Sequence, residues 1–166
     1  YDHLKRGMTT LRDAASVDNI SGDLRDIFRA GILRGPTVIS SHEGISMTGG
    51  HGSLLGSGLP NPGRVADGPD EVRKAVRTQL KAGADWIKLM AGAGLVAMPE
   101  HEDPRFVEYS VEELRAGVEE AHKRMRPVTV HSHAAQGVKN AVEAGVDCVE
   151  HGTIMDEEAV EMMKKN

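Results

Sequence analysis

The sequence predicts an α/β fold with a parallel sheet, and three observations support this prediction. Five short runs rich in β-branched residues alternate with stretches whose apolar residues recur at helical spacing, as in repeated strand–helix–strand units. The runs are almost continuously apolar, which is typical of strands covered on both faces. One joint also occurs twice, in residues 81–85 and 143–147: a helix ends at a glycine, and an aspartate two residues later precedes a strand.

The first half of the chain predicts two strands and one helix before a long glycine-rich segment. Residues 8–13 form a short β-type run with two threonines, and residues 36–40 form the second predicted strand. Between them, residues 22–30 carry apolar side chains at helical spacing, and Gly31 ends that helix. Residues 41–68 are expected to lack regular structure, and a loop of that length is usually functional or disordered.

The second half predicts three further strands, each followed by a helix. A helix opens at Pro69 with two acids in its first turn, and another opens at Ser110, where Glu113 completes a capping box. The predicted strands cover residues 84–90, 127–131 and 147–151, and the remaining helices cover residues 137–144 and the stretch from Asp156 onward.

Composition excludes several classes of protein. The chain has 166 residues, a formal net charge of -5 and 3% aromatic residues, so it carries neither a basic stripe nor a stacking platform for nucleic acid. The length predicts one domain over residues 1–166. The single cysteine, Cys148, excludes an internal disulfide and suits a cytoplasmic protein. No run approaches the roughly 18 apolar residues of a membrane span.

Side chains that can carry chemistry stand near the carboxyl ends of three predicted strands. They are Lys88, His131 and His151. Because active sites in parallel sheets gather at those ends, we expect the three to converge. Strand alternation puts His133 on the face of His131, and puts Cys148 on the face opposite to His151, in the core.

These residue types favour a metal site. Imidazole nitrogen suits zinc and similar divalent ions. A buried lysine is unusual, so Lys88 is interpreted as a metal ligand or a catalytic amine. A protonated lysine is a poor ligand, but carbon dioxide converts a neutral amine into a carbamate, whose oxygens can bridge two metals. Such a pair of metals can share a hydroxide and polarise a carbonyl group.

Six segments, in order and spacing, resemble the amidohydrolase superfamily, in particular its Xaa-Pro dipeptidase (prolidase-like) and imidazolonepropionase-related members. The segments are Gly7-Met8-Thr9-Thr10-Leu11-Arg12-Asp13, Thr48-Gly49-Gly50-His51-Gly52, Gly83-Ala84-Asp85-Trp86-Ile87-Lys88-Leu89, Glu120-Ala121-His122, His131-Ser132-His133 and Glu150-His151-Gly152-Thr153.

The resemblance implies a TIM-type (β/α)8 barrel that is incomplete in this chain, which would supply strands two to six. By the same resemblance, Lys88 is the carboxylated bridging lysine, and His131 and His151 are metal ligands from the next two strands. His133 and His51 are expected to contact substrate. Tyr109 is a further candidate for the substrate pocket.

The resemblance also implies an activity. The expected reaction is metal-dependent hydrolysis of an amide or peptide bond, in a dipeptide or an N-acyl amino acid, by a metal-bound hydroxide. The expected cofactors are two divalent ions, zinc in the first instance, with a carbamate on Lys88. The family's strand-one His-x-His pair and its strand-eight aspartate, the general base, have no counterpart here, so we expect a part of a longer protein. Exposed strand edges also leave a homo-oligomer open.

Three alternatives remain open at this point. A cyclic-amide hydrolase of the imidazolonepropionase kind would share the chemistry, but would have little use for a carboxylated lysine. A barrel that binds a phosphate ligand would use residues 91–94 as a backbone cradle and Lys88 as an ammonium group. A non-catalytic scaffold would use none of these residues. His122 is interpreted as structural, and Arg12 and Asp13 as a structural ion pair.

Overall fold

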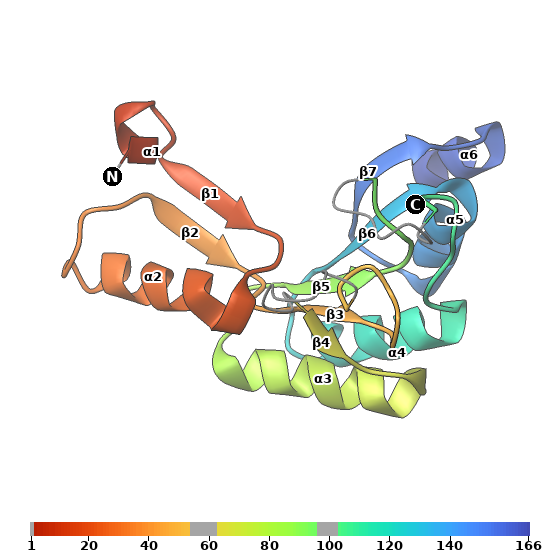
Figure 1. The fold of residues 1–166 in the computed structure, drawn as a ribbon, viewed down its shortest axis with the longest axis horizontal. Helices are drawn as coiled ribbons and strands as arrows, with labels where there is room; N and C mark the ends of the chain where they lie inside the picture. Colours follow the sequence, from red (N-terminus) through yellow and green to blue (C-terminus); the bar gives the residue numbers. More distant parts are fainter. Residues whose placement is uncertain (1, 54–62, 96–102) are drawn as a thin grey trace.

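The strands of this chain run parallel to one another in two adjoining sheets (Figure 1). The computed structural model describes residues 2–53, 63–95 and 103–166. In the smaller sheet, β1 (Thr10–Asp13) pairs with β2 (Thr37–Ser40). The larger sheet has the order β4-β3-β5-β6-β7, built from β4 (Gly63–Val65), β3 (Gly44–Ser46), β5 (Ile87–Met90), β6 (Val128–Ala134) and β7 (Cys148–Ile154). The predicted α/β class with a parallel sheet is confirmed.

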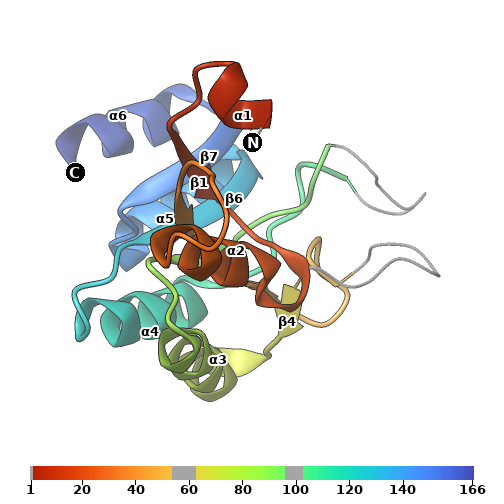
Figure 2. The same cartoon turned by 90° about the vertical axis from the view of Figure 1, so that its left-hand side faces the viewer.

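Helices cover the outer side of the larger sheet. In the view of Figure 2, α3, α4, α5 and α6 follow one another around one side of the strands. The helices are α1 (Asp2–Lys5), α2 (Ile20–Arg29), α3 (Gly68–Ala82), α4 (Val111–His122), α5 (Ala135–Ala144) and α6 (Glu157–Lys165), with a 3-10 turn at Val17–Asn19. None of the helices in the described part of the chain is long and apolar enough to cross a membrane.

Burial of the central strands follows from this arrangement. Every residue of β5 and β6 is buried, as predicted from their apolar sequences. Their outer side chains pack with apolar residues of α3 and α4 in one core. The capping box predicted at Ser110 is present, since its hydroxyl accepts the Glu113 N–H and the Glu113 carboxylate accepts the Ser110 N–H.

The glycine-rich segment from 41 to 68 departs from the prediction. It begins and ends with short strands, β3 and β4, while residues 54–62 lie outside the described part. A strand of three residues has too little sequence pattern to be recognised. β3 forms because Ile45 pairs with Leu89 of β5 on one side and β4 pairs on the other. The described chain therefore contains seven strands instead of the five predicted.

The joint that occurs twice in the sequence makes the same contacts twice. Asp85 donates its backbone N–H to the Ser40 carbonyl at 2.8 Å and accepts the Ser40 N–H on its carboxylate at 3.0 Å. Asp147 does the same with Val128, at 3.0 and 2.7 Å. Each aspartate thus holds the start of its strand against both backbone groups of one residue in another strand: the end of β2 for Asp85 and the start of β6 for Asp147.

Glycine and a basic side chain complete each joint. Gly83 and Gly145 take left-handed conformations, with φ of 95° and 84°, which end the preceding helix and release the chain toward the strand. The Asp85 carboxylate also accepts from Arg25, and that of Asp147 lies 2.8 Å from His122 Nε2. His122 therefore has the structural role that was predicted for it.

We expect Asp85→Ala to lower the free energy of unfolding by about 2–4 kcal/mol at pH 7. The substitution removes the acceptor for the Ser40 N–H and one partner of Arg25, whose side chain is only 5% exposed. Urea unfolding would measure the change. A control, Glu161→Ala on the exposed face of α6, should change the value by less than about 0.5 kcal/mol.

The same comparison has a defined pH dependence. Burial alone raises the pKa of Asp85, but the Ser40 N–H and the Arg25 guanidinium outweigh it, so the pKa lies below its ordinary 3.8. A lowered carboxyl pKa stabilises the fold above that ordinary value, and the contribution is lost as the pH falls through the folded-state pKa. The difference in free energy of unfolding between wild type and Asp85→Ala should therefore become smaller below about pH 4. A constant gap down to pH 2 would contradict the assignment.

A candidate metal centre at the carboxyl ends of the strands

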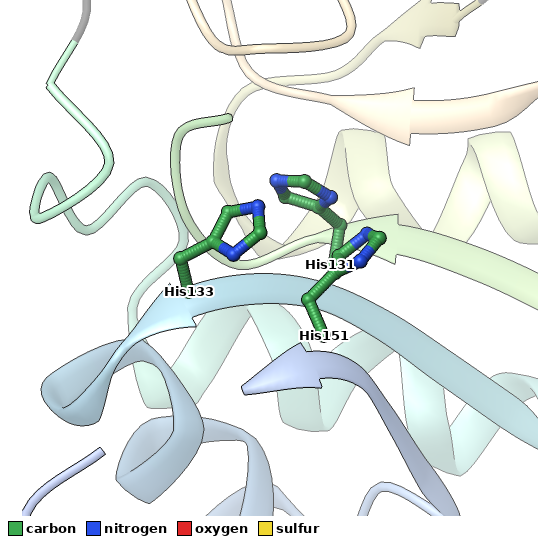
Figure 3. A group of neighbouring side chains, drawn as sticks. All are labelled: His131, His133 and His151. Carbon is green, nitrogen blue, oxygen red and sulfur yellow. The ribbon is translucent and has the colours of Figure 1, made fainter. Parts of the chain in front are cut away.

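Three histidines converge along the second half of β6 and at the middle of β7 (Figure 3). His131 and His133 come from β6 and His151 from β7. One ring nitrogen of each lies within 4.8 Å of the other two, and ring centroids are 4.6–4.9 Å apart. Three imidazoles at this spacing form a donor set suited to zinc and similar divalent ions.

The two histidines of β6 share a face because one residue separates them on a regular strand. Thr129 shares that face, and its hydroxyl donates to the Glu150 carboxylate of β7 at 2.8 Å. Glu150, which pairs with His131 on the ladder, therefore also points to the side of the cluster. Alternation along β7 would then turn His151 away.

A local reversal of the backbone brings His151 back to the cluster. His151 and Gly152 have φ of 72° and 59°, in the left-handed region that side chains other than glycine rarely adopt. For an L-residue this conformation costs about 1–2 kcal/mol. The prediction that Cys148 lies in the core, opposite to His151, was wrong: its sulfur lies 3.9 Å from Glu150 Oε1, on the side of the cluster.

His51 joins the same group of rings from the loop after β3. Its imidazole stacks on His131, with centroids 4.5 Å apart and an interplanar angle of 18°. Its backbone N–H donates to Glu108 at 2.6 Å. A methyl group at Gly94 would lie 2.0 Å from the His51 ring, so the glycine is what lets the ring lie there.

Tyr109 lies in the hydrophobic core. Its side chain is fully buried, and its hydroxyl donates to the Ala66 carbonyl at 2.8 Å. Burial raises the pKa of this phenol. The position argues against the predicted contact with substrate, because the hydroxyl already has a backbone acceptor inside the core.

Lys88 is buried on β5, with 3% of its surface exposed. Burial lowers the pKa of its amine from 10.5 to about 7, although the nearby Glu150 carboxylate opposes this change. A substantial fraction of the amine is therefore neutral at physiological pH. A neutral amine can act as a nucleophile, whereas an exposed lysine would be an ammonium ion.

The imidazoles are neutral for a related reason. Burial, and then the charge of Lys88, lower the pKa of His131 to about 3. Burial is also the main cause that lowers the pKa of His133 and of His151. His131 Nε2 lies 3.0 Å from the Ala93 carbonyl, which can only accept, so Nε2 carries the proton and Nδ1 has the lone pair.

Two contacts beside the cluster were not predicted from the sequence. His133 Nδ1 lies 2.7 Å from the Thr153 hydroxyl, and the Ala93 carbonyl orients His131. Thr153 follows His151 by two residues, in one of the segments that resemble the amidohydrolase superfamily. That resemblance was the available sequence signal for Thr153. A backbone carbonyl carries no sequence signal of this kind.

The glycine-rich run after β5 does not favour the phosphate alternative. Ala91 donates its N–H to the His131 carbonyl at 2.9 Å, and Ala93 donates to the Phe106 carbonyl at 3.2 Å. Gly92 bridges to Val107. Two of the N–H groups that a phosphate cradle would need are therefore already used.

Comparison with known proteins agrees with this geometry. The sequence matches the amidohydrolase family over residues 2–165. The chain belongs to this family. It is 37% identical to the ochratoxinase of Aspergillus niger over 183 residues, which cover 99% of this chain and 37% of that protein.

Solved structures show the same relationship. The crystal structure of A. niger ochratoxinase superposes with a TM-score of 0.88 at 34% identity, over 99% of this chain and 41% of the other. That of an Xaa-Pro dipeptidase with bound methionine in the active site gives a TM-score of 0.87 at 34% identity, over 97% and 41%. These neighbours are TIM-type barrels, so this chain supplies part of such a barrel and spans about two fifths of the length of its relatives.

We expect His131→Ala or His151→Ala to weaken Zn²⁺ binding by more than about 100-fold, because removing a ligand should exceed the 10- to 100-fold effect of removing a residue that only orients one. Zinc content after dialysis against a competing chelator would measure this. His3→Ala, on the exposed helix α1, is the control and should bind zinc as the wild type does. Equal zinc content in all the variants would exclude the cluster as the site.

Proposed function

We propose that this chain carries the metal-binding side of a metal-dependent amidohydrolase that cleaves an amide or peptide bond in a dipeptide or an N-acyl amino acid. The observation that carries the proposal is the convergence of three imidazoles from β6 and β7, near a buried Lys88 on β5, the strand that pairs with β6. The relative that holds methionine in its active site supports a substrate that contains an amino acid.

The donor set fits divalent ions. Lys88, His131 and His151 are the residues that would hold two metal ions, with zinc the first choice for imidazole nitrogen. When bound, such ions polarise a carbonyl group and lower the pKa of water toward neutrality. His131 would offer Nδ1, since its Nε2 proton is engaged by Ala93. Burial lowers the pKa of all three groups, which reduces the competition of protons with a metal ion for their lone pairs.

Lys88 would reach its ligand form through its own chemistry. The neutral amine attacks carbon dioxide, a nitrogen–carbon bond forms, and one proton leaves the nitrogen to solvent. The product is a carbamate anion, which is an oxygen donor like a carboxylate. The lowered pKa of Lys88 supports this step, because an ammonium group has no lone pair with which to attack.

His133 and His51 would orient the substrate. Both rings lie against His131, His133 at 4.9 Å and His51 at 4.5 Å between centroids. An imidazole N–H can donate to the carboxylate or the carbonyl oxygen of an amino-acid substrate. The imidazolonepropionase-like alternative is less favoured, since a buried lysine beside the histidines has little use there.

We expect Lys88→Ala to lower kcat/KM for dipeptides or N-acyl amino acids by at least about 1,000-fold, a barrier change of about 4 kcal/mol. The measurement is hydrolysis by the metal-loaded protein that contains this chain, over a panel of such substrates. Added acetate or propionate should restore part of the activity by replacing the lost carbamate. Lys81→Ala, an exposed lysine near the end of α3, is the control and should remain active. An active Lys88→Ala enzyme would remove the carbamate from the proposal.

A pH series tests the carbamate separately. Protein incubated with ¹³C-bicarbonate should take up label at Lys88, detected by carbon NMR, and uptake should rise as the pH increases through about 7. The sign follows from the lowered pKa, because only the amine that has lost its proton reacts. Uptake that begins only near pH 10 would show that Lys88 behaves as an exposed lysine.

A further inference from the structure

An ion pair joins the two sheets across their inner side. Arg12 of β1 and Glu150 of β7 lie 2.6 Å apart, from Nη2 to Oε1. β1 belongs to the two-stranded sheet, and β7 is the last strand of the five-stranded one. In Figure 1 the two strands lie on opposite sides of the view, β1 at the left and β7 at the right. The sequence favoured a pairing of Arg12 with Asp13, but the structure pairs it with Glu150.

Both members of the pair are held by further contacts. The Arg12 guanidinium lies 4.2 Å from the centre of the Trp86 ring, and Trp86 donates its indole N–H to the Asp13 carbonyl at 3.1 Å. Glu150 Oε1 also accepts the Thr129 hydroxyl at 2.8 Å. The Glu150 carboxylate is therefore fixed from β1 and from β6, and its side chain is 20% exposed.

Glu150 immediately precedes the backbone reversal at His151. Because Glu150 points inward, a regular strand would direct His151 outward, as the ladder pairing of His151 with Ser132 indicates. The left-handed backbone at His151 instead places its ring 4.6 Å from that of His131 and 4.7 Å from that of His133. Without an anchor at Glu150, β7 can relax to regular alternation, and the His151 ring then leaves the cluster.

We propose that Arg12 and Glu150 are positioning residues that hold His151 within the metal-binding cluster. The importance of His151 rests on the function proposed above, but the location of its ring can be measured in protein without metal. The structure also offers a matched comparison. Arg77 and Glu120 form an ion pair at 2.8 Å between α3 and α4, on the outer helical layer.

The test compares ring contacts in metal-free protein by NMR. Wild type should show nuclear Overhauser effects between the ring protons of His151 and those of His131 and His133. Arg12→Met and Glu150→Gln should lose or strongly weaken them. Thr129→Val, which removes one contact to Glu150 and leaves the ion pair intact, should weaken them less. Arg77→Met should keep these nuclear Overhauser effects, even if it lowers the melting temperature as much as Arg12→Met and Glu150→Gln do.

A second measurement uses Co²⁺ as the probe. We expect Arg12→Met and Glu150→Gln to bind Co²⁺ about 10- to 100-fold more weakly and to change its visible absorption spectrum. Arg12→Lys keeps a cation opposite Glu150, so it should restore part of the Co²⁺ affinity and part of the wild-type absorption spectrum. A purely structural ion pair would lower the melting temperature without altering the spectrum of the protein that stays folded.

The outcomes separate the two proposals. The positioning role would be overturned if folded Arg12→Met and Glu150→Gln keep the ring contacts of His151 unchanged. It would also be overturned if Arg77→Met loses these contacts to the same extent, or if wild type does not show them. If the variants lose the contacts while wild type binds no Co²⁺, the positioning role stands and the metal-dependent function fails.

Discussion

An aspartate holds the start of β5 and another holds the start of β7, and the geometry of the site depends on these contacts. Asp85 binds both backbone groups of Ser40 at the end of β2, and Asp147 binds both backbone groups of Val128 at the start of β6. A slip of one residue would turn every side chain of a strand to the opposite face. By holding the start of β7 against Val128 of β6, Asp147 fixes the register in which His131 stands beside Glu150, while Asp85 ties the start of β5 to the smaller sheet.

Burial then determines the chemistry of the residues that arrive there. Lys88 and His131 lie on the central strands, and the loss of hydration disfavours their charged forms. A neutral amine and a neutral imidazole are the forms that react with carbon dioxide or bind a metal. A buried ionisable group opposes folding. Here the apolar core shared by β5, β6, α3 and α4 provides the compensating stabilisation.

The end of β7 shows how this sheet departs from regular geometry at the candidate site. Both Glu150 and His151 face the inner side, which no regular strand allows for consecutive residues. The left-handed backbone at His151 resolves this conflict at a small conformational cost. Contacts from β1 and β6 to Glu150 come from parts of the chain that are distant in sequence, so the site draws on both sheets.

Local sequence determined much of this protein. Apolar spacing, the capping box at Ser110 and the glycine–aspartate joints were enough to predict the principal helices and strands, because each depends on residues close together in the chain. The same patterns placed Lys88 and His131 on strands, although the structure puts Lys88 near the start of β5 and His131 in the middle of β6, not at the strand ends as predicted. The tertiary structure decided the rest: β3 exists through pairing with β5, Tyr109 found its acceptor across the core, and His151 turned inward beside an anchored Glu150. These outcomes depend on contacts between residues far apart in the sequence, which a local pattern does not encode.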